Sequence, residues 1–514
     1  MSATSQPAFS RRSLVALLAV SLSSLMFGLE ISSVPAILPT LEKVLGADFV
    51  ELQWIMNAYT IAVTTVLMAT GTIADRYGRK RVFVVGIAAF GLASLACGLT
   101  ESVSVLIVAR FLQGMSGGAM LICQVAVLSH QFQEGRARGL AFSAWGIIFG
   151  IGLGFGPIVG GAIVAVWSWE WVFLIHGALS LVTLGLALGG VEESRDPEAT
   201  RLDLPGIVTL SVAVFCLAYF ITQGPDLGFA SPAALTILAV SVASFLAFLV
   251  AEKVSPRPMF DFTVFRIRPF SGAVIGSAAM NISFWPFMIY LPIWFQAGLG
   301  YDSVAAGSAL LAYTLPTLVV PPLAERLSLR YRPGLVIPAG LILIGLGFFA
   351  MKLGSGVENA SWLTMLPGCV LAGIGLGFTN TPVTNTTTGS VPAARAGMAS
   401  GIDMSARMIS LAINIALMGF LLVEGVRASL QAALPADVDP AILRQLAQQV
   451  AAGTAVSTEH GVSGAVVHLA LVDGFGWILL YGGIGVWLLA VASYLVFGRG
   501  AASQAACPAE QAAR

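Results

Sequence analysis

The sequence predicts an all-α integral membrane protein, because the chain is long, apolar and poor in charge. Of its 514 residues, 57% are hydrophobic and only 10% are charged, and the mean hydropathy is +0.88. A soluble protein of this size needs more charged residues to cover its surface. Apolar runs of about 20 residues, the length of a transmembrane helix, recur along the chain. The formal net charge is zero, so there is no basic field for nucleic acid.

We expect fourteen transmembrane helices, since fourteen apolar segments are long enough to cross a bilayer. They are residues 13–39, 52–73, 82–100, 103–129, 139–166, 171–191, 204–222, 233–251, 270–297, 304–324, 334–353, 362–388, 399–423 and 475–497. The first follows Arg11 and Arg12 and so imitates a signal peptide, but its apolar run is too long for one and contains an acid. The even number of spans puts both termini on one side.

The basic residues choose that side. If the N-terminus is cytoplasmic, twenty lysines and arginines fall in inside segments and only four, Lys43, Lys352, Arg427 and Arg444, fall outside. Arg110 and Arg407 lie within spans. This asymmetry follows the positive-inside rule and predicts a cell (inner) membrane protein with both termini in the cytoplasm.

A weak internal repeat divides the chain. GTIADRYGRKRVF (71–83) follows the second span and PPLAERLSLRYRP (321–333) follows the tenth, and both read Leu or Ile, Ala, acid, Arg. We therefore predict five parts: a cytoplasmic tail (1–12), an N-terminal six-helix bundle (13–191), two inserted transmembrane helices with linkers (192–269), a C-terminal six-helix bundle (270–497) and a cytoplasmic tail (498–514).

One long external loop, residues 424–474, is predicted inside the C-terminal bundle. Its stretch DPAILRQLAQQV has Asp439 as N-cap and Pro440 at the first helical position. Ile442, Leu446 and Val450 share one face, so we expect a short helix lying on the outer surface.

Ionisable residues within spans are informative because each is costly in hydrocarbon. They are Glu30, Arg110, Asp403 and Arg407. Glu30 has no basic residue within a helical turn. Burial favours its neutral form, so it can bind and release protons near neutral pH, and its anion suits a cationic ligand. The alternative is that Glu30 only pairs with Arg110 to hold the bundle together.

The pair Asp403 and Arg407 and the residue His176 also lie inside spans, and each allows two interpretations. Asp403 and Arg407 are four residues apart and can pair on one helix face, which either neutralises them or serves a function. Of the four histidines, only His176 lies well inside a span, where a buried structural role is favoured over a proton relay.

Two stretches carry mechanical signals. In residues 71–83, Gly71 permits close helix approach, Gly78 a tight turn, and Asp75 can cap a neighbouring helix. The basic residues of this stretch, Arg76, Arg79 and Lys80 among them, can form salt bridges or contact anionic lipid, or serve only as a positive-inside anchor.

Span 5 contains GIIFGIGLGFGPIVGG (146–161), with seven glycines and one proline. Glycines let another helix pack closely or slide, and Pro157 removes a backbone hydrogen bond and kinks the helix. The alternatives are ordinary small-residue packing and a bendable helix at a moving interface.

With these residues in view, nearly the whole chain resembles the fourteen-span drug:proton antiporters of the major facilitator superfamily. The superfamily loop signature G-x-L-a-D-R-x-G-R-K is matched by Gly71, Asp75, Arg76, Gly78, Arg79 and Lys80, with Ile73 for Leu. The span 4 signature R-x-x-Q-G is matched by Arg110, Gln113 and Gly114. The antiporter signature G-x-x-x-G-P-x-x-G-G is matched by Gly152, Gly156, Pro157, Gly160 and Gly161.

The resemblance implies the major facilitator fold and alternating access driven by the proton gradient. It implies that the Asp75 loop forms a cytoplasmic latch, that Arg110 takes part in proton coupling, and that the Gly-Pro helix enforces exchange. The chain also departs from the family pattern: Glu30 stands for Asp, Pro35 for Asn, and Asp403 for Asn. The acid at position 403 offers a second proton site or suits a dicationic substrate.

The predicted function is therefore export of lipophilic, cationic drugs or toxic compounds in exchange for protons. The alternatives are export of one metabolite, siderophore or lipid, and a non-transporting sensor or scaffold. No catalytic, nucleotide or metal motif is present in the sequence, so we expect neither an enzyme nor a cofactor. The expected partners are the small-molecule substrate, protons and lipids, with a periplasmic adaptor and outer-membrane channel also considered. The candidate cavity-lining aromatics, which packing alone also explains, are Trp54, Trp145, Phe149, Trp285 and Trp294.

Overall fold

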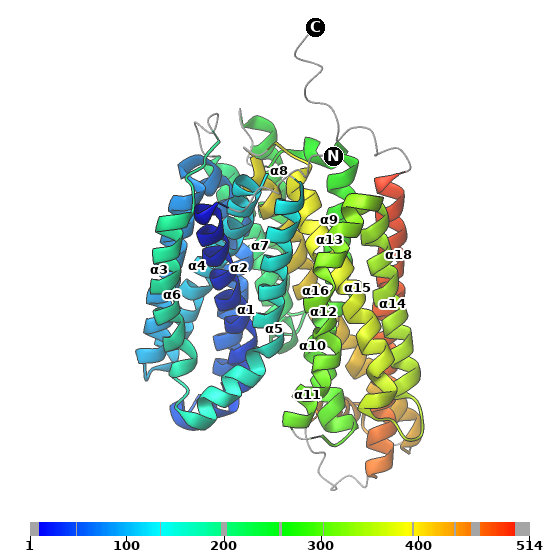
Figure 1. The fold of residues 1–514 in the computed structure, drawn as a ribbon. Helices are drawn as coiled ribbons and strands as arrows, with labels where there is room; N and C mark the ends of the chain where they lie inside the picture. Colours follow the sequence, from blue (N-terminus) through cyan, green and yellow to red (C-terminus); the bar gives the residue numbers. More distant parts are fainter. Residues whose placement is uncertain are drawn as a thin grey trace. The chain divides into compact units, whose positions relative to one another are not determined.

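The computed structural model describes residues 10–47, 49–133, 135–196, 203–255, 260–301, 303–392, 395–435, 438–453 and 463–498, and this part of the chain is built from helices (Figure 1). In the first half these are α1 (Arg11–Leu45), α2 (Phe49–Tyr77), α3 (Arg79–Leu99), α4 (Val103–Gln131), α5 (Gly135–Val166), α6 (Trp171–Gly190), α7 (Leu204–Leu227) and α8 (Pro232–Val254).

The second half begins with a short 3-10 helix, η1 (Phe262–Arg266), followed by α9 (Arg268–Met280), α10 (Phe284–Ile293) and the π-helical turn η2 (Trp294–Gly298). The rest of it comprises α11 (Ser303–Thr314), α12 (Pro316–Val319), α13 (Pro321–Tyr331), α14 (Pro333–Ser355), α15 (Trp362–Gly389), α16 (Ala396–Ala433), α17 (Pro440–Ala451) and α18 (Gly464–Phe497).

Within the described residues, thirteen helices are long and apolar enough to cross a membrane, and a bent pair brings the number to fourteen. The pair is 305–319 with 321–331, bent by 42°. Proline explains the break, since Pro321 begins α13 and cannot donate the backbone hydrogen bond that would continue the helix. The predicted ninth span is likewise divided, into α9, α10 and η2, with Pro292 inside α10.

The chain forms two compact units. The first comprises residues Met1–Asp261 together with Val391–Ser405, which include the start of α16. Here α1 packs against α5 and α6, α2 against α4, and α3 against α4 and α6. The pair α7–α8, predicted as an insertion, belongs to this unit, because α7 packs on α2 and the Trp54 and Tyr219 rings lie 5.5 Å apart.

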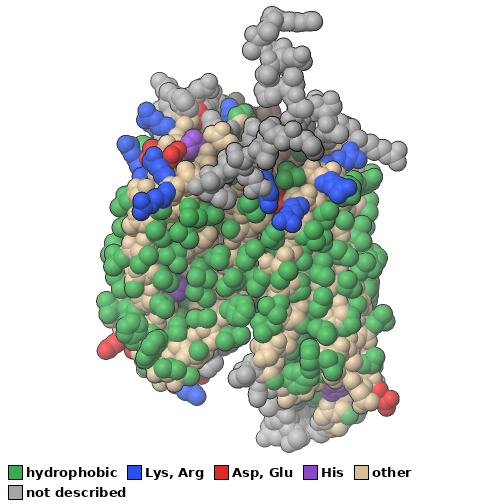
Figure 2. Space-filling view, in the orientation of Figure 1, with side chains coloured by type: hydrophobic (Ala, Val, Ile, Leu, Met, Phe, Trp, Pro, Cys, Tyr) green, Lys and Arg blue, Asp and Glu red, His purple; other side chains and the backbone are tan. Residues whose placement is uncertain are grey.

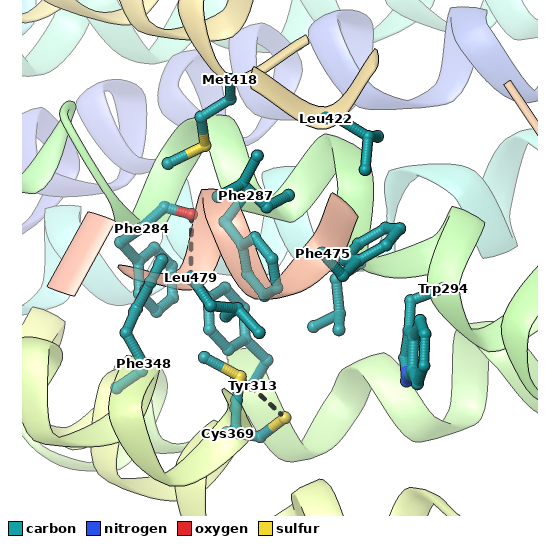
Figure 3. Close-up of a cluster of buried hydrophobic side chains, with 14 of the residues drawn as sticks. Phe284, Phe287, Trp294, Tyr313, Phe348, Cys369, Met418, Leu422, Phe475 and Leu479 are labelled. Carbon is teal, nitrogen blue, oxygen red and sulfur yellow. Dashed lines mark hydrogen bonds between the residues drawn. The ribbon is translucent and has the colours of Figure 1, made fainter. Parts of the chain in front are cut away.

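The second unit comprises Phe262–Ser390 and Ala406–Arg514. Aromatic side chains from α10, α11, α14 and α18 fill its core (Figure 3). The Tyr313 ring stacks on Phe284 with a centroid distance of 4.0 Å, and the Tyr313 hydroxyl donates to the Phe284 carbonyl at 3.0 Å. Trp294 is fully buried in this cluster and Trp145 in the first unit, as expected of packing residues.

The helix α17 differs from its prediction. Its buried side chains are Leu443, Leu446, Ala447, Val450 and Ala451, whereas Ile442 is exposed. This face belongs to the core of the second unit and packs on α18, because a helix with so clear an apolar stripe buries it against neighbouring helices. The predicted loop 424–474 is also shorter, since α16 extends to Ala433 and α18 begins at Gly464.

The surface of each unit fits a bilayer. Hydrophobic side chains cover the flanks of the helices, and Lys and Arg gather at the helix ends (Figure 2). Exposed Leu, Val and Phe side chains on these flanks suit contact with lipid tails.

Candidate functional site

An ion pair is buried in the middle of the first unit. The Glu30 carboxylate on α1 and the Arg110 guanidinium on α4 are 0% and 1% exposed, and Arg110 Nη1 donates to Glu30 Oε1. The structure thus joins two residues that are 80 positions apart in the sequence. Arg110 on α4 thus gives Glu30 the basic partner that α1 does not provide. The Glu30–Arg110 pairing on which the alternative interpretation depends is present.

Three further groups hold Arg110 in place. Its Nε donates to the Ile55 carbonyl on α2 at 3.1 Å, and its Nη1 donates to Gln113 Oε1 at 2.8 Å. The guanidinium carbon lies 4.4 Å from the centre of the Tyr59 ring, a cation–π contact. A buried arginine is tolerated only where its donors are satisfied in this way.

The hydrogen bonds continue from Arg110 to α3. Gln113 Nε2 donates to Ser94 Oγ at 2.7 Å, which fixes the orientation of the amide and turns its oxygen toward Arg110. The R-x-x-Q spacing therefore has a physical reason, because residues three apart on a helix share a face. Ser94 and Tyr59 could not be identified as site residues from the sequence, because such residues are common in apolar helices.

His176 lies on the other side of Glu30. Its side chain is 2% exposed, and its Nδ1 is 3.4 Å from Glu30 Oε2 and 2.9 Å from the Val172 carbonyl oxygen. The sequence identified His176 as buried and hydrogen-bonded, but could not place it beside the acid.

The net charge of this cluster depends on whether Glu30 is ionised. With Glu30 ionised, the pair with Arg110 is neutral overall, and protonation of the carboxylate leaves Arg110 as an unbalanced buried cation. The ionised and the neutral form of Glu30 therefore differ in the electrostatic contact between α1 and α4.

The predicted latch residues form a second site at one end of the first unit. Arg79 Nη2 donates to Asp75 Oδ1 at 2.8 Å, and both side chains are buried. Asp75 also accepts from the backbone N–H groups of Gly397 at 3.2 Å and Met398 at 3.0 Å. These are free donors in the first turn of α16, so a carboxylate there is stabilised by hydrogen bonds and by the helix dipole.

Two latch glycines have different structural reasons, which are close backbone approach at Gly71 and a positive φ at Gly78. A Cβ added to Gly71 would lie 2.6 Å from the Gly397 carbonyl oxygen. Gly78 has φ +110°, which side chains rarely adopt, and the Glu193 carboxylate occupies the space beside it.

The basic latch residues have separate roles. Lys80 Nζ donates to the Leu188 carbonyl at 2.8 Å, near the end of α6, and the Lys80 backbone N–H donates to Glu193 at 3.1 Å. Arg76 is partly exposed, with its guanidinium 5.2 Å from the Tyr77 ring. Of the basic residues in this loop, Arg79 is the one paired with Asp75.

The glycines of α5 fall into two groups. A Cβ added to Gly152 would lie 2.8 Å from the Leu25 carbonyl oxygen, one on Gly156 only 1.8 Å from Ser32 Oγ, and one on Gly160 2.8 Å from the Ser33 carbonyl oxygen. These glycines recur every fourth residue, so they form a stripe along which α1 and α5 pack closely.

Gly161 does not belong to that stripe, because an added Cβ there meets nothing within 4 Å. The backbone of α5 is helical through position 157. The Pro157 side chain lies outside the described residues.

The remaining predicted pair lies on α16. Arg407 belongs to the second unit, where its Nη1 donates to Asn380 Oδ1 and its Nη2 donates to Thr384 Oγ1 at 2.7 Å. Asp403 is fully buried, one helical turn earlier, in the part of α16 that belongs to the first unit. The structure thus places Asp403 and Arg407 on one continuous helix that is shared by both units.

The fold and these buried charges define a class: a polytopic helical membrane protein with ionisable side chains inside the membrane. The chain belongs to the Major Facilitator Superfamily, whose sequence model matches residues 20–414.

Curated proteins similar to the chain carry names from drug resistance. The Multidrug resistance protein Stp of Mycobacterium tuberculosis is 31% identical over 88% of this chain and 83% of that protein. The Tetracenomycin C resistance and export protein of Streptomyces glaucescens is 29% identical over 96% and 93% of the two chains. The Quinolone resistance protein NorB of Staphylococcus aureus is 28% identical over 78% and 87%.

Solved structures agree on the fold. The proton:xylose symporter XylE matches with a TM-score of 0.61 at 14% identity, covering 94% of this chain and 95% of its own. The human organic anion transporter MFSD10 matches with a TM-score of 0.59 at 13% identity, covering 96% and 100%. At these identities the likeness establishes the fold alone.

Proposed function

We propose that this protein is a proton-driven antiporter that exports lipophilic, cationic drugs or toxic compounds by alternating access. The carrying observation is the buried Glu30–Arg110 pair, a protonatable acid inside a membrane bundle. The names of the similar proteins, which refer to multidrug resistance, antibiotic export and quinolone resistance, support the substrate class.

Proton and cation compete for the same charge in this mechanism. An ionised Glu30 attracts a cationic substrate, and protonation removes that attraction and releases the substrate. A ligand shifts a conformational equilibrium only by its differential affinity for the two states. Proton binding at Glu30 supplies such a difference, because it leaves Arg110 without its counter-charge.

The latch stabilises one of the two states. Asp75 holds the first turn of α16 through Gly397 and Met398, while Arg79 balances its charge. The glycine stripe of α5 supplies the closely packed helix pair that the antiporter signature implies, with Gly152, Gly156 and Gly160 against α1. Asp403 and Arg407 complete the proposed coupling residues, since α16 continues from one unit into the other.

The setting follows from the charge asymmetry of the sequence. The protein is a multi-pass membrane protein, and we place both termini in the cytoplasm of a cell with an energised inner membrane. The proton gradient replaces any cofactor, and the protein is a transporter rather than an enzyme. A periplasmic adaptor and an outer-membrane channel are partners that this proposal permits and does not require.

A second candidate function is export of one defined compound. One similar protein is named for resistance to a single compound, tetracenomycin C, and covers 96% of this chain. A non-transporting sensor or scaffold has no comparable support, since the chain has both the hydrogen bonds of the latch and the close contacts of the glycine stripe.

Proteoliposomes with an imposed pH gradient test the proposal. Wild-type protein should move a cationic dye such as ethidium, Glu30→Asp should keep proton-driven transport, and Glu30→Gln should lose it because Gln cannot ionise. If the wild-type protein moves none of a panel of cationic dyes, the hypothesis of proton-driven export of cationic drugs is refuted. Transport by Glu30→Gln at the wild-type rate would remove Glu30 from coupling.

A further inference from the structure

His176 faces the oxygen of Glu30 that Arg110 does not use. Arg110 donates to Oε1, whereas Oε2 has no hydrogen-bond partner within the described residues and lies 3.4 Å from His176 Nδ1. The buried carboxylate therefore has one oxygen held by a cation that does not give up its proton and one oxygen facing a titratable ring.

The hydrogen bond to the backbone fixes the tautomer of His176. The Val172 carbonyl can only accept, and it lies 2.9 Å from Nδ1, so Nδ1 carries the hydrogen and Nε2 the lone pair. Nε2 is buried and has no hydrogen-bond partner among the described residues. A buried basic nitrogen without a hydrogen-bond partner is energetically costly and needs an explanation. A role in proton transfer is one such explanation. The Phe90 ring packs edge-on at 5.9 Å, which holds the imidazole in its plane.

Few charged groups surround the ring. The helices packed on α6 are α1, α3 and α5. Glu30 comes from α1, and among the described residues of α3 the Cys97 thiol is linked to the cluster through Gln113 Oε1 at 3.8 Å. Arg110 reaches Glu30 from α4. With Glu30 ionised and His176 neutral the cluster has no net charge, one proton makes it +1, and a second would place two positive charges in a desolvated site.

We propose that His176 is the proton relay to Glu30, a role that rests on the proposed function because it serves proton exchange at that acid. A proton binds Nε2 while the Nδ1 hydrogen moves to Glu30 Oε2. The products are a neutral carboxylic acid and a neutral imidazole with its hydrogen on Nε2, so one proton enters and one is stored. Discharge is the reverse: Oε2 returns its proton to Nδ1 and Nε2 releases one.

The Val172 carbonyl makes the second tautomer of His176 temporary. After delivery, the Nδ1 lone pair faces the carbonyl oxygen, which is unfavourable and drives the ring back to its first tautomer when Glu30 releases its proton. The relay therefore resets without any change in side-chain position.

His176→Asn and His176→Gln test the relay, with His468→Asn as the matched control on an exposed histidine of α18. The full chain is reconstituted in proteoliposomes, and ethidium transport is followed against pH in water and in deuterium oxide. Both His176 variants should lose proton-driven rate by about tenfold or more, a modest share of what acid–base groups contribute. Their thermal stability and equilibrium ethidium affinity should stay at wild-type values.

A structural role would give a different result. If His176→Asn keeps the wild-type rate and pH profile, or if its rate falls only in proportion to ethidium affinity and thermal stability, the relay is refuted. The pH profile and the solvent isotope effect separate the cases, because a packing defect slows transport equally at every pH.

A direct measurement separates this inference from the proposed function. The ¹⁵N imidazole shifts of His176 in nanodiscs, assigned by comparison with His176→Asn, report tautomer and charge whether or not any dye is transported. With spectra recorded from about pH 8 to about pH 5, we expect the imidazole hydrogen to move from Nδ1 to Nε2 when Glu30 takes up its proton, and this change to be altered in Glu30→Gln. An imidazole that never changes state over that range refutes the relay, whereas a wild type that moves no dye refutes only the proposed function.

Discussion

The α1–α5 contact allows a sharp test, because two nearby glycines of α5 differ in whether their positions have room for a larger residue. A Cβ at Gly156 would lie 1.8 Å from Ser32 Oγ, whereas a Cβ at Gly161 meets nothing within 4 Å. We therefore predict that Gly156→Ala destabilises the protein and that Gly161→Ala does not.

The magnitude follows from what Ser32 must do. The single hydrogen of its hydroxyl is shared between the Gly28 carbonyl at 2.8 Å and the Gly152 carbonyl at 3.0 Å. Moving it away loses a membrane-buried hydrogen bond of about 0.6 kcal/mol, and overpacking adds about 1–3 kcal/mol. Gly161→Ala should instead be neutral or stabilise by about 0.4–1 kcal/mol, since a helical glycine has more unfolded-state entropy to lose.

Thermal unfolding in nanodiscs and proton-driven dye transport measure both variants. Ser32→Gly removes the side chain that an alanine at position 156 would strike, so the double variant should recover most of the stability lost in Gly156→Ala. A double-mutant cycle should give a coupling energy of about 1 kcal/mol or more. Equal stability of the two alanine variants, or no recovery with Ser32→Gly, would contradict a close contact between Gly156 and Ser32.

Three other predictions test separate parts of the structure. Asp75→Asn should lower transport by about tenfold or more, because breaking a buried pair costs about 3–5 kcal/mol; Arg76→Gln is the control and should leave the rate near wild type, and equal loss in both would contradict the assigned pairing. Tyr313→Phe should lower thermal stability by about 0.5–1.5 kcal/mol by removing the hydrogen bond to the Phe284 carbonyl, with an unchanged transport pH profile; an unchanged melting temperature would count against that bond. Leu446→Gln on the buried face of α17 should destabilise the protein by about 2 kcal/mol or more, and Ile442→Gln should be tolerated, which circular dichroism melts in nanodiscs can compare.

The apolar runs of the sequence were enough to predict a helical membrane protein, and the resemblance carried by the signature stretches added the major facilitator fold. These predictions depend on local features of the sequence, namely span length, the sign of the flanking charges and the three signature stretches. Each can be recognised without knowledge of the tertiary contacts. The same locality identified Glu30, since an acid within an apolar run is visible in one helix alone.

The breaks in spans nine and ten were less visible, because a proline within an apolar run is compatible with either a kinked or a divided helix. On α17 the prediction was right for Leu446 and Val450 and wrong for Ile442, since Ile442 and Leu443 both fit an apolar stripe and only contacts within the second unit choose between them.

The sequence by itself determined the class of protein, the number of spans and the residue types that carry charge, because hydrophobic thickness and the cost of buried charge act on each segment separately. Only the tertiary structure decided which of those residues work together. It brought Glu30 to Arg110 and His176, Asp75 to the first turn of α16, and three of the four antiporter-signature glycines of α5 into contact with α1. These contacts join residues far apart in the chain, and only packing of the helices decides which of them meet.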